Sequence, residues 1–196
     1  MFDDLLLLPS DSFPAVCLEP DGRCRLDAPR PPLLLCGSFN PLHEGHRQMA
    51  QRAADWLGLP VAFELSLINV EKPPLQEPEV RQRARAFRSL APLWLTCLPT
   101  YVAKAVVFPG TFFVVGADTA QRILEPRFYQ QPLHQALEFL GRQRCRFVVA
   151  GRVDSSGRFV TLADLGVPRA FADLFVELPG FRLDVSSTAL RQSGNA

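Results

Sequence analysis

The chain has 196 residues and a formal net charge of +1, and hydrophobic residues make up 47% of it. This composition is typical of a folded globular protein, and the length suits one domain with a substantial core. A net charge so close to zero provides no global field that would draw the protein to nucleic acid or to anionic lipid. The sequence contains no apolar run of about 18 residues, so no membrane-spanning helix is expected.

The cysteines indicate a reduced protein rather than a disulfide-linked one. They number five, and no two of them form a Cys-x-x-Cys pair. This pattern favours neither a disulfide framework nor a zinc site, and the reducing cytoplasm suits it best. We therefore expect buried, apolar thiols at all five positions, which are Cys17, Cys24, Cys36, Cys97 and Cys145.

Residues 1–32 are predicted to form an N-terminal hairpin extension that precedes the main domain at 33–196. Two short strand-like runs within residues 13–26 flank the turn sequence Pro20-Asp21-Gly22. Proline presets φ and glycine accepts positive φ, so this tripeptide favours a tight turn between two strands.

After residue 32, short apolar runs alternate with segments of helical periodicity. Strands are predicted at 33–36, 62–70, 93–97, 111–116, 145–150 and 174–178. Helices are predicted at 44–57, 79–90, 101–107, 118–124, 132–140 and 186–192. The alternation predicts an α/β fold with a Rossmann-like, mostly parallel sheet of five to six strands and helices on both faces. Ligands of such folds bind at the carboxyl ends of the strands, so residues that follow strands are candidates for a site.

The segment Gly37-Ser-Phe-Asn-Pro-Leu-His-Glu-Gly-His46 follows the first of these strands. His43 and His46 are three residues apart at the start of a helix, so both can point to one side. A turn that contains glycine and leads into a helix N-terminus is a natural anion site, and two imidazoles above it can stabilise developing charge. The same spacing would also suit two metal ligands, but no third ligand is apparent.

The segment Asp184-Val-Ser-Ser-Thr-Ala-Leu-Arg191 predicts a second phosphate site near the end of the chain. Ser186, Ser187 and Thr188 offer hydroxyl and N–H groups at a helix start, and Arg191 lies within one turn of them. An arginine in that position is suited to triphosphate oxygens. The alternative interpretation is a capped terminal helix with a surface arginine.

Three other segments contribute candidates after strands. Gly116 permits close approach of a ligand, and Asp118 can accept hydrogen bonds from a ribose or base, although an aspartate there is also a typical helix N-cap. Asn69 and Lys72 follow the second strand, where a solvated loop is the alternative. Lys104 lies on a predicted helix, and the residues leave open whether it belongs to the surface or to the site.

The segment at 37–46 resembles the G-S-F-(N/D)-P-x-H-x-G-H string of nicotinamide and nicotinate mononucleotide adenylyltransferases, which belong to the nucleotidyltransferase superfamily with the HxGH motif. The segment at 184–191 resembles the I-S-S-T-x-(I/L)-R motif of that superfamily, with Val185 in place of isoleucine. The resemblance covers roughly residues 33–192. The sequence Lys72-Pro-Pro-Leu75 departs from the P-P-H-K-like string of family members. This departure bears on which acceptor the protein uses.

The resemblance implies transfer of AMP from ATP to a phosphorylated acceptor, most readily nicotinamide or nicotinate mononucleotide, with release of pyrophosphate. It implies Mg²⁺ held by the ATP phosphates, with no metal ligand from the protein. ATP and a small phosphorylated acceptor are the expected partners, nucleic acid and membrane are not, and self-association is left open. The implied catalytic residues are His43, His46 and Arg191. The implied nucleotide-binding residues are Gly37, Ser38, Phe39, Gly45, Gly116, Asp118, Ser186, Ser187 and Thr188, and the acceptor-binding residues are Asn69, Lys72 and Lys104.

The sequence is also compatible with other functions. The same chemistry with CTP or with another phosphorylated acceptor is a close alternative, although the cytidylyltransferase string R-T-x-G-I-S-T is absent. A nucleotide-binding regulatory protein with little turnover is a second alternative, and the intact motifs argue against it. A nucleic-acid-binding module has no supporting motif.

Overall fold

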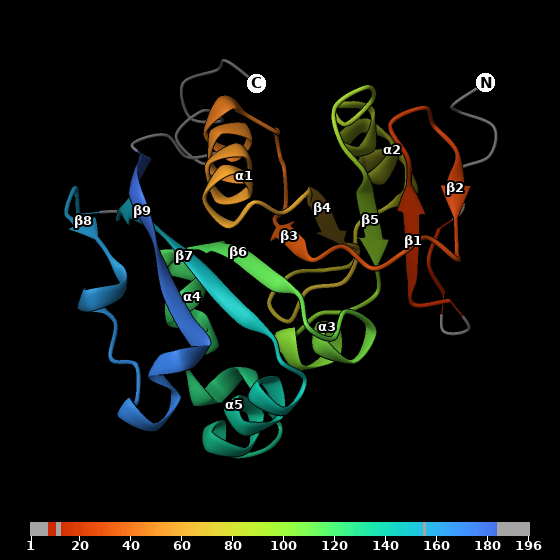
Figure 1. The fold of residues 1–196 in the computed structure, drawn as a ribbon. Coiled ribbons are helices and arrows are strands. Elements are labelled where there is room, and N and C mark those ends of the chain that lie inside the picture. Colours follow the sequence, from red (N-terminus) through yellow and green to blue (C-terminus); the bar gives the residue numbers. More distant parts are fainter. Residues whose placement is uncertain (1–7, 11–12, 155, 184–196) are drawn as a thin grey trace.

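The structure is a computed structural model, and it describes residues 8–10, 13–154 and 156–183. Within this part of the chain one nine-stranded sheet forms the centre of the molecule (Figure 1). Its strands are β1 (Ala15–Leu18), β2 (Cys24–Arg25), β3 (Leu33–Cys36), β4 (Val61–Ser66), β5 (Leu93–Thr96), β6 (Phe112–Gly116), β7 (Arg146–Val153), β8 (Phe159–Val160) and β9 (Phe175–Leu183). They follow the order β2-β1-β5-β4-β3-β6-β7-β8, and β9 pairs with β7 outside this path.

Strands β5, β4, β3, β6, β7 and β9 pair in parallel, in that spatial order. The prediction of an α/β fold with a mostly parallel sheet is thereby confirmed. Strand β3 lies centrally, with β4 on one side and β6 on the other. The order of the strands therefore reverses at β3, and the carboxyl ends of β3 and β6 flank the position where ligands bind in open α/β sheets.

The predicted N-terminal hairpin is also confirmed, and it belongs to the same sheet. Strands β1 and β2 pair antiparallel, and β1 pairs antiparallel with β5 over four positions, from Ala15 opposite Thr96 to Leu18 opposite Leu93. All four residues of β1 are buried. The hairpin thus covers the edge that β5 would otherwise expose to solvent, which protects it from pairing with other chains.

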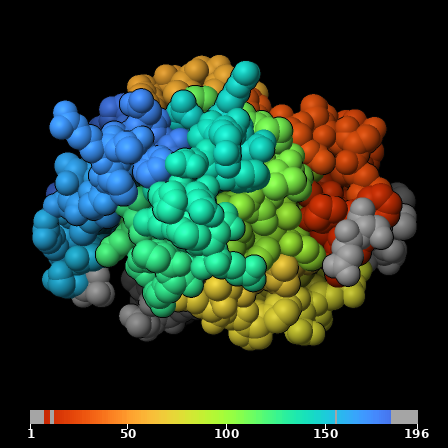
Figure 2. All heavy atoms as spheres, turned by 90° about the horizontal axis from the view of Figure 1, so that it is seen from below, coloured from red at the N-terminus to blue at the C-terminus, as the bar shows by residue number. Residues whose placement is uncertain are grey.

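Helices cover both faces of the sheet, as predicted. They are α1 (Glu44–Leu57), α2 (Glu77–Arg85), α3 (Tyr101–Val107), α4 (Ala117–Ile123) and α5 (Leu133–Arg142), with short 3-10 helices η1 (Pro126–Phe128), η2 (Leu162–Asp164) and η3 (Arg169–Leu174). Residues of α1 and α2 pack in one core, and residues of α3, α4 and α5 pack in the other. Figure 2 shows the second face, closed by the green to cyan segments. Side chains alternate between the two cores along each strand, so Leu33 and Leu35 face α1 while Leu34 faces α3.

Some predicted bounds are wrong, for local reasons. The strand predicted at 62–70 ends at Ser66, whose hydroxyl donates to the carbonyls of Ile68 at 2.7 Å and Leu98 at 3.1 Å and turns the chain away. The helix predicted at 79–90 is α2, which begins at Glu77 and ends at Arg85. Beyond it, Ser89 has a φ of 56°, which a right-handed helix does not contain. The helix predicted at 186–192 lies outside the described residues.

The prediction about the cysteines requires correction, and the two tryptophans differ in burial. Trp94 is buried, but Trp56 is 43% exposed because the buried face of α1 contains Met49, Ala50 and Ala53 and Leu57 packs beside it. All five cysteines are free thiols, as expected, but the prediction that all five are buried is wrong. Cys17 and Cys145 are buried, whereas Cys24, Cys36 and Cys97 are partly exposed. No helix among the described residues is long and apolar enough to cross a membrane.

Gly58 ends α1 in the left-handed conformation, with a φ of 64°. A side chain there would meet no neighbour within 4 Å, so only the backbone conformation opposes a substitution. We expect Gly58→Ala to lower the free energy of unfolding by about 1 kcal/mol, because alanine disfavours positive φ. Urea denaturation measures this difference.

Gly166 provides the matched control, since a side chain there also meets open space and its φ is not positive. Gly166→Ala should be neutral or slightly stabilising, because it only reduces the freedom of the unfolded chain. Equal losses in the two variants would contradict the assignment of the cost to the left-handed backbone of Gly58.

Candidate active site

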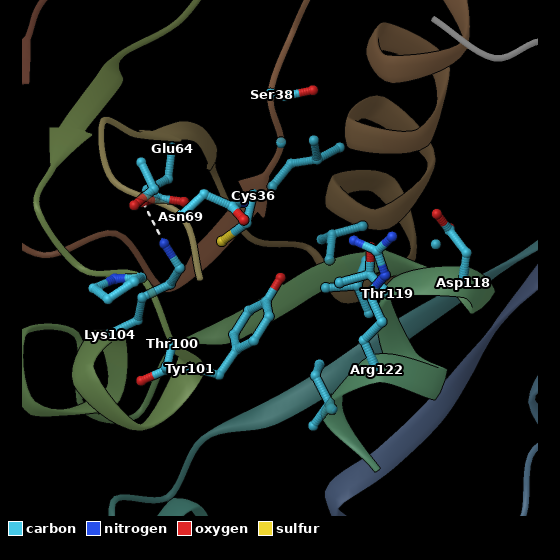
Figure 3. Close-up of a pocket in the computed structure, with 18 of the residues that line it drawn as sticks. Cys36, Ser38, Glu64, Asn69, Thr100, Tyr101, Lys104, Asp118, Thr119 and Arg122 are labelled. Carbon is cyan, nitrogen blue, oxygen red and sulfur yellow. Dashed lines mark hydrogen bonds and ion pairs between the residues drawn. The ribbon is translucent and has the colours of Figure 1, made fainter. Parts of the chain in front are cut away.

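A cavity of about 410 Å³ opens at the carboxyl ends of the central parallel strands. Cys36 at the end of β3, Ser66 at the end of β4, Gly116 at the end of β6 and Arg152 near the end of β7 all line it. Figure 3 shows Glu64, Asn69 and Lys104 on one side of the cavity, Asp118 and Thr119 on the other, and Tyr101 between them. Its volume lies within the range of small-molecule sites.

The two histidines of the segment at 37–46 lie side by side at the start of α1. Their rings are stacked, with centroids 3.7 Å apart, and both line the cavity. The backbone N–H of His43 donates to Nδ1 of His46 at 3.3 Å. In a neutral imidazole the other nitrogen then carries the proton, so Nε2–H of His46 is a donor for a ligand.

The His43 ring also has a nitrogen that is available to a ligand. Among the described residues, His43 Nδ1 is the buried side-chain nitrogen or oxygen that has no hydrogen-bond partner. Buried polar atoms are nearly always satisfied in folded proteins, and an exception calls for an explanation. A ligand bound at this position would supply the missing hydrogen-bond partner and so explain the exception.

The surroundings keep both imidazoles neutral. Burial, and to a smaller extent the proximity of His43 and Arg152, lowers the pKa of His46 to about 3. Burial and the nearby Arg152 also lower the pKa of His43 below its usual value. At neutral pH the pair therefore offers hydrogen bonds without a prior positive charge, at the N-terminal end of a helix whose dipole favours anions.

Phe39 supports the histidine pair from behind and is not among the described residues that line the cavity. It is 1% exposed, and its ring meets His46 edge-on at 5.1 Å and Phe87 at 5.1 Å. A side chain at Gly37 would lie 2.7 Å from the Phe39 ring, which explains the glycine. Gly45 is buried in the first turn of α1 and likewise does not line the cavity.

Arg83 of α2 holds the turn before α1 in place. Its guanidinium donates to the carbonyl of Ser38 at 3.0 Å and pairs with Glu79 at 3.2 Å. Gly37 and Ser38 both line the cavity. Arg83 thus braces the turn of the candidate site.

Asp118 and Arg152 form an ion pair across the ends of β6 and β7, at 2.9 Å. The N-cap of α4 is Gly116, so the alternative interpretation of Asp118 as an N-cap is wrong. A side chain at Gly116 would lie 2.7 Å from Asp118 Oδ1, so a larger residue there would displace the Asp118 carboxylate. Arg152 is half-buried and lines the cavity.

Lys104, whose position the sequence left open, is buried and lines the cavity. Its Nζ lies 2.5 Å from Oε1 of Glu64, which also accepts a hydrogen bond from Thr96 at 2.5 Å. Sequence reasoning missed Glu64. The signal was present, because Glu64 is the one acidic residue in the apolar run Val61-Ala-Phe-Glu-Leu65.

Asn69 and Lys72 both line the cavity, from the exposed loop that follows β4. Asn69 Oδ1 accepts a hydrogen bond from the backbone N–H of Glu71 at 2.9 Å. Glu71 in turn pairs with Arg122 at 3.6 Å and with Arg127 at 3.2 Å. These ion pairs join the loop to α4 and η1 at the rim of the cavity.

Part of the predicted site lies outside the described residues, namely Ser186, Ser187, Thr188 and Arg191. Among the described residues, no group of three or more His, Cys, Asp or Glu side chains is placed to hold a metal ion. Magnesium binds oxygen ligands, keeps several waters and is often carried by substrate phosphates. A magnesium ion carried by the phosphates of a bound nucleotide would not require such a group.

The low pKa of His46 predicts acid-sensitive stability. In the unfolded chain the imidazole takes up a proton near pH 6.5, whereas in the fold it stays neutral down to about pH 3. The unfolded state binds more protons in this window, so the free energy of unfolding should fall as the pH drops from 6.5 towards 3. His46→Gln should lose less stability over that range, which urea unfolding at several pH values measures.

His134 lies exposed on α5 and provides the control. His134→Gln should retain the wild-type dependence on pH. If His46→Gln retains it as well, His46 is not held neutral by the fold.

Comparison with known proteins assigns the chain to a family. A family model described as cytidylyltransferase-like matches residues 34–193, which include the cavity and all of the parallel strands except Leu33, the first residue of β3. No curated protein matches the chain. The matched span covers most of the 196 residues. The chain therefore belongs to the cytidylyltransferase-like family of nucleotidyltransferases.

Proposed function

We propose that this protein transfers AMP from ATP to a phosphorylated acceptor, nicotinamide or nicotinate mononucleotide, and releases pyrophosphate. The observation that carries the proposal is the stacked pair of His43 and His46 at the N-terminus of α1, inside the cavity. Both imidazoles are neutral, and among the described residues Nδ1 of His43 has no hydrogen-bond partner. Phosphate oxygens supply the missing acceptors and the negative charge that the helix N-terminus favours.

The reaction proposed is a direct displacement. An oxygen of the acceptor's phosphate forms a bond to the α-phosphorus of ATP, while the bond from that phosphorus to the bridging oxygen breaks and pyrophosphate leaves in line. No side-chain nucleophile takes part, so the protein contributes position and charge stabilisation. His46 is the best-placed group, because its Nε2–H can donate to an oxygen whose charge grows in the transition state.

The remaining candidates take supporting roles in this proposal. Asp118, held by Arg152, offers carboxylate oxygens to the ribose or base of the nucleotide. Ser187, Thr188 and Arg191 would hold the β- and γ-phosphates. Magnesium, bound to the phosphates when the nucleotide is present, would neutralise part of the triphosphate charge.

Replacement of His46 tests the chemistry. His46→Ala should reduce pyrophosphate release by about 10²- to 10³-fold, the loss that removal of one stabilising donor produces. The assay contains ATP, magnesium and nicotinamide or nicotinate mononucleotide, and it measures pyrophosphate over time. His134→Ala, which alters an exposed histidine on α5, should keep wild-type activity. Wild-type turnover in His46→Ala would contradict the role of the pair.

The nucleotide is tested separately, because the family description favours CTP as the competing donor. We expect ATP to raise the melting temperature and to support transfer of AMP, and CTP to do so less well. Mass spectrometry of the product identifies the transferred group. Transfer of CMP in preference to AMP would show that the nucleotide assignment is wrong while the transfer chemistry stands.

A further inference from the structure

The floor of the cavity contains a buried ion pair that phosphate chemistry does not use. Glu64 is 1% exposed and Lys104 is 4% exposed, and both line the cavity. Figure 3 shows them on the side opposite Asp118. Apolar residues of similar volume often stabilise a protein as well as a buried ion pair does, so the stability of the fold does not explain these charges.

The fold holds this pair rigidly. Glu64 lies in the middle of β4 on the face towards α3, since its neighbours Phe63 and Leu65 pack in the opposite core. Oε1 of Glu64 accepts from Lys104 and from Thr96, both at 2.5 Å. Lys104 belongs to α3, whose start is capped by the hydroxyl of Thr100. A ligand therefore meets a fixed donor and a fixed acceptor at this floor.

The charge of the floor is balanced. The carboxylate of Glu64 offsets the ammonium of Lys104, and across the cavity Asp118 offsets Arg152 in the same way. A carboxylate brought to the floor would lie beside Glu64, and placing like charges next to each other in a poorly solvated site is unfavourable. A carboxamide has an N–H donor for Glu64 and a carbonyl acceptor for Lys104, and it carries no charge.

We propose that Glu64 and Lys104 bind the head group of the acceptor and select a neutral carboxamide over a carboxylate. This inference rests on the proposed function and names the acceptor's chemistry within it. Nicotinamide mononucleotide should therefore be used in preference to nicotinate mononucleotide, two acceptors that differ in this group. The pair acts on specificity, because a site that opposes the wrong charge discriminates as strongly as one that attracts the right group.

The test is a competition between the two acceptors. Wild-type protein, ATP and magnesium are mixed with equal concentrations of nicotinamide and nicotinate mononucleotide, and the two dinucleotide products are separated by chromatography. The initial product ratio equals the ratio of kcat/KM values, so a general loss of activity cancels. Wild type should favour the amide product by at least about tenfold.

Variants that leave opposite charges on the floor should move the ratio in opposite directions. Glu64→Gln leaves the ammonium of Lys104 and should shift the ratio towards the carboxylate by about tenfold, whereas Lys104→Met leaves the carboxylate of Glu64 and should shift it further towards the amide. A variant that is merely less stable cannot produce both shifts. Glu138→Gln, at an exposed position on α5, should keep the wild-type ratio.

The double variant Glu64→Gln with Lys104→Met keeps the floor neutral and should give a ratio between those of the single variants. Circular dichroism reports whether each variant folds. If a single variant does not fold, the wild-type and double-variant ratios decide, and equal use of both acceptors by wild type overturns this inference.

The outcomes separate the two proposals. A wild-type preference for nicotinate, or a ratio that none of the variants changes, overturns the role of the floor and leaves the proposed transfer of AMP intact. No dinucleotide product from either acceptor overturns the proposed function, and the selection of its head group with it.

Discussion

The central position of β3 is the constraint on which the rest of this structure depends. Parallel strands pair with β3 on both sides, β4 on one and β6 on the other, so their carboxyl ends meet at one edge of the sheet. Leu33 and Leu34 are fully buried, as a strand covered by helices on both faces requires. The chain leaves β3 directly into the turn before α1, and His43 and His46 consequently lie above the crevice where ligands bind in such folds.

At this edge of the sheet, the packing of neighbouring side chains holds His46 and the turn before α1 in place. The Phe39 ring lies between the core and His46, and Arg83 holds the carbonyl of Ser38 from α2. Fixed supports of this kind matter because a catalytic group must be held within a fraction of an ångström of its working position. The burial that positions His46 also keeps it neutral, so the same contacts determine its place and its protonation.

Charged groups around the cavity are arranged mostly in pairs. Glu64 pairs with Lys104, Asp118 with Arg152, and Glu71 with Arg122 and Arg127. In the proposed function a triphosphate would bring negative charge to the histidine side, and the balanced pairs would limit where else an anion can bind. The proposed selection of the acceptor depends on this proposed division between a region for phosphates and a neutral floor.

The sequence by itself determined the alternation of strands and helices, the hairpin and the segment at 37–46, because each depends on residues that are near one another in the chain. Helix α1 was predicted with its observed bounds for this reason. Only the tertiary structure decided the partners of Lys104 and Asp118. Lys104 and Glu64 are 40 residues apart and meet through the packing of α3 on the sheet, while Asp118 meets Arg152 through the pairing of β6 with β7. Local sequence patterns cannot predict such contacts, because they arise from the register and packing of segments that are far apart in the chain.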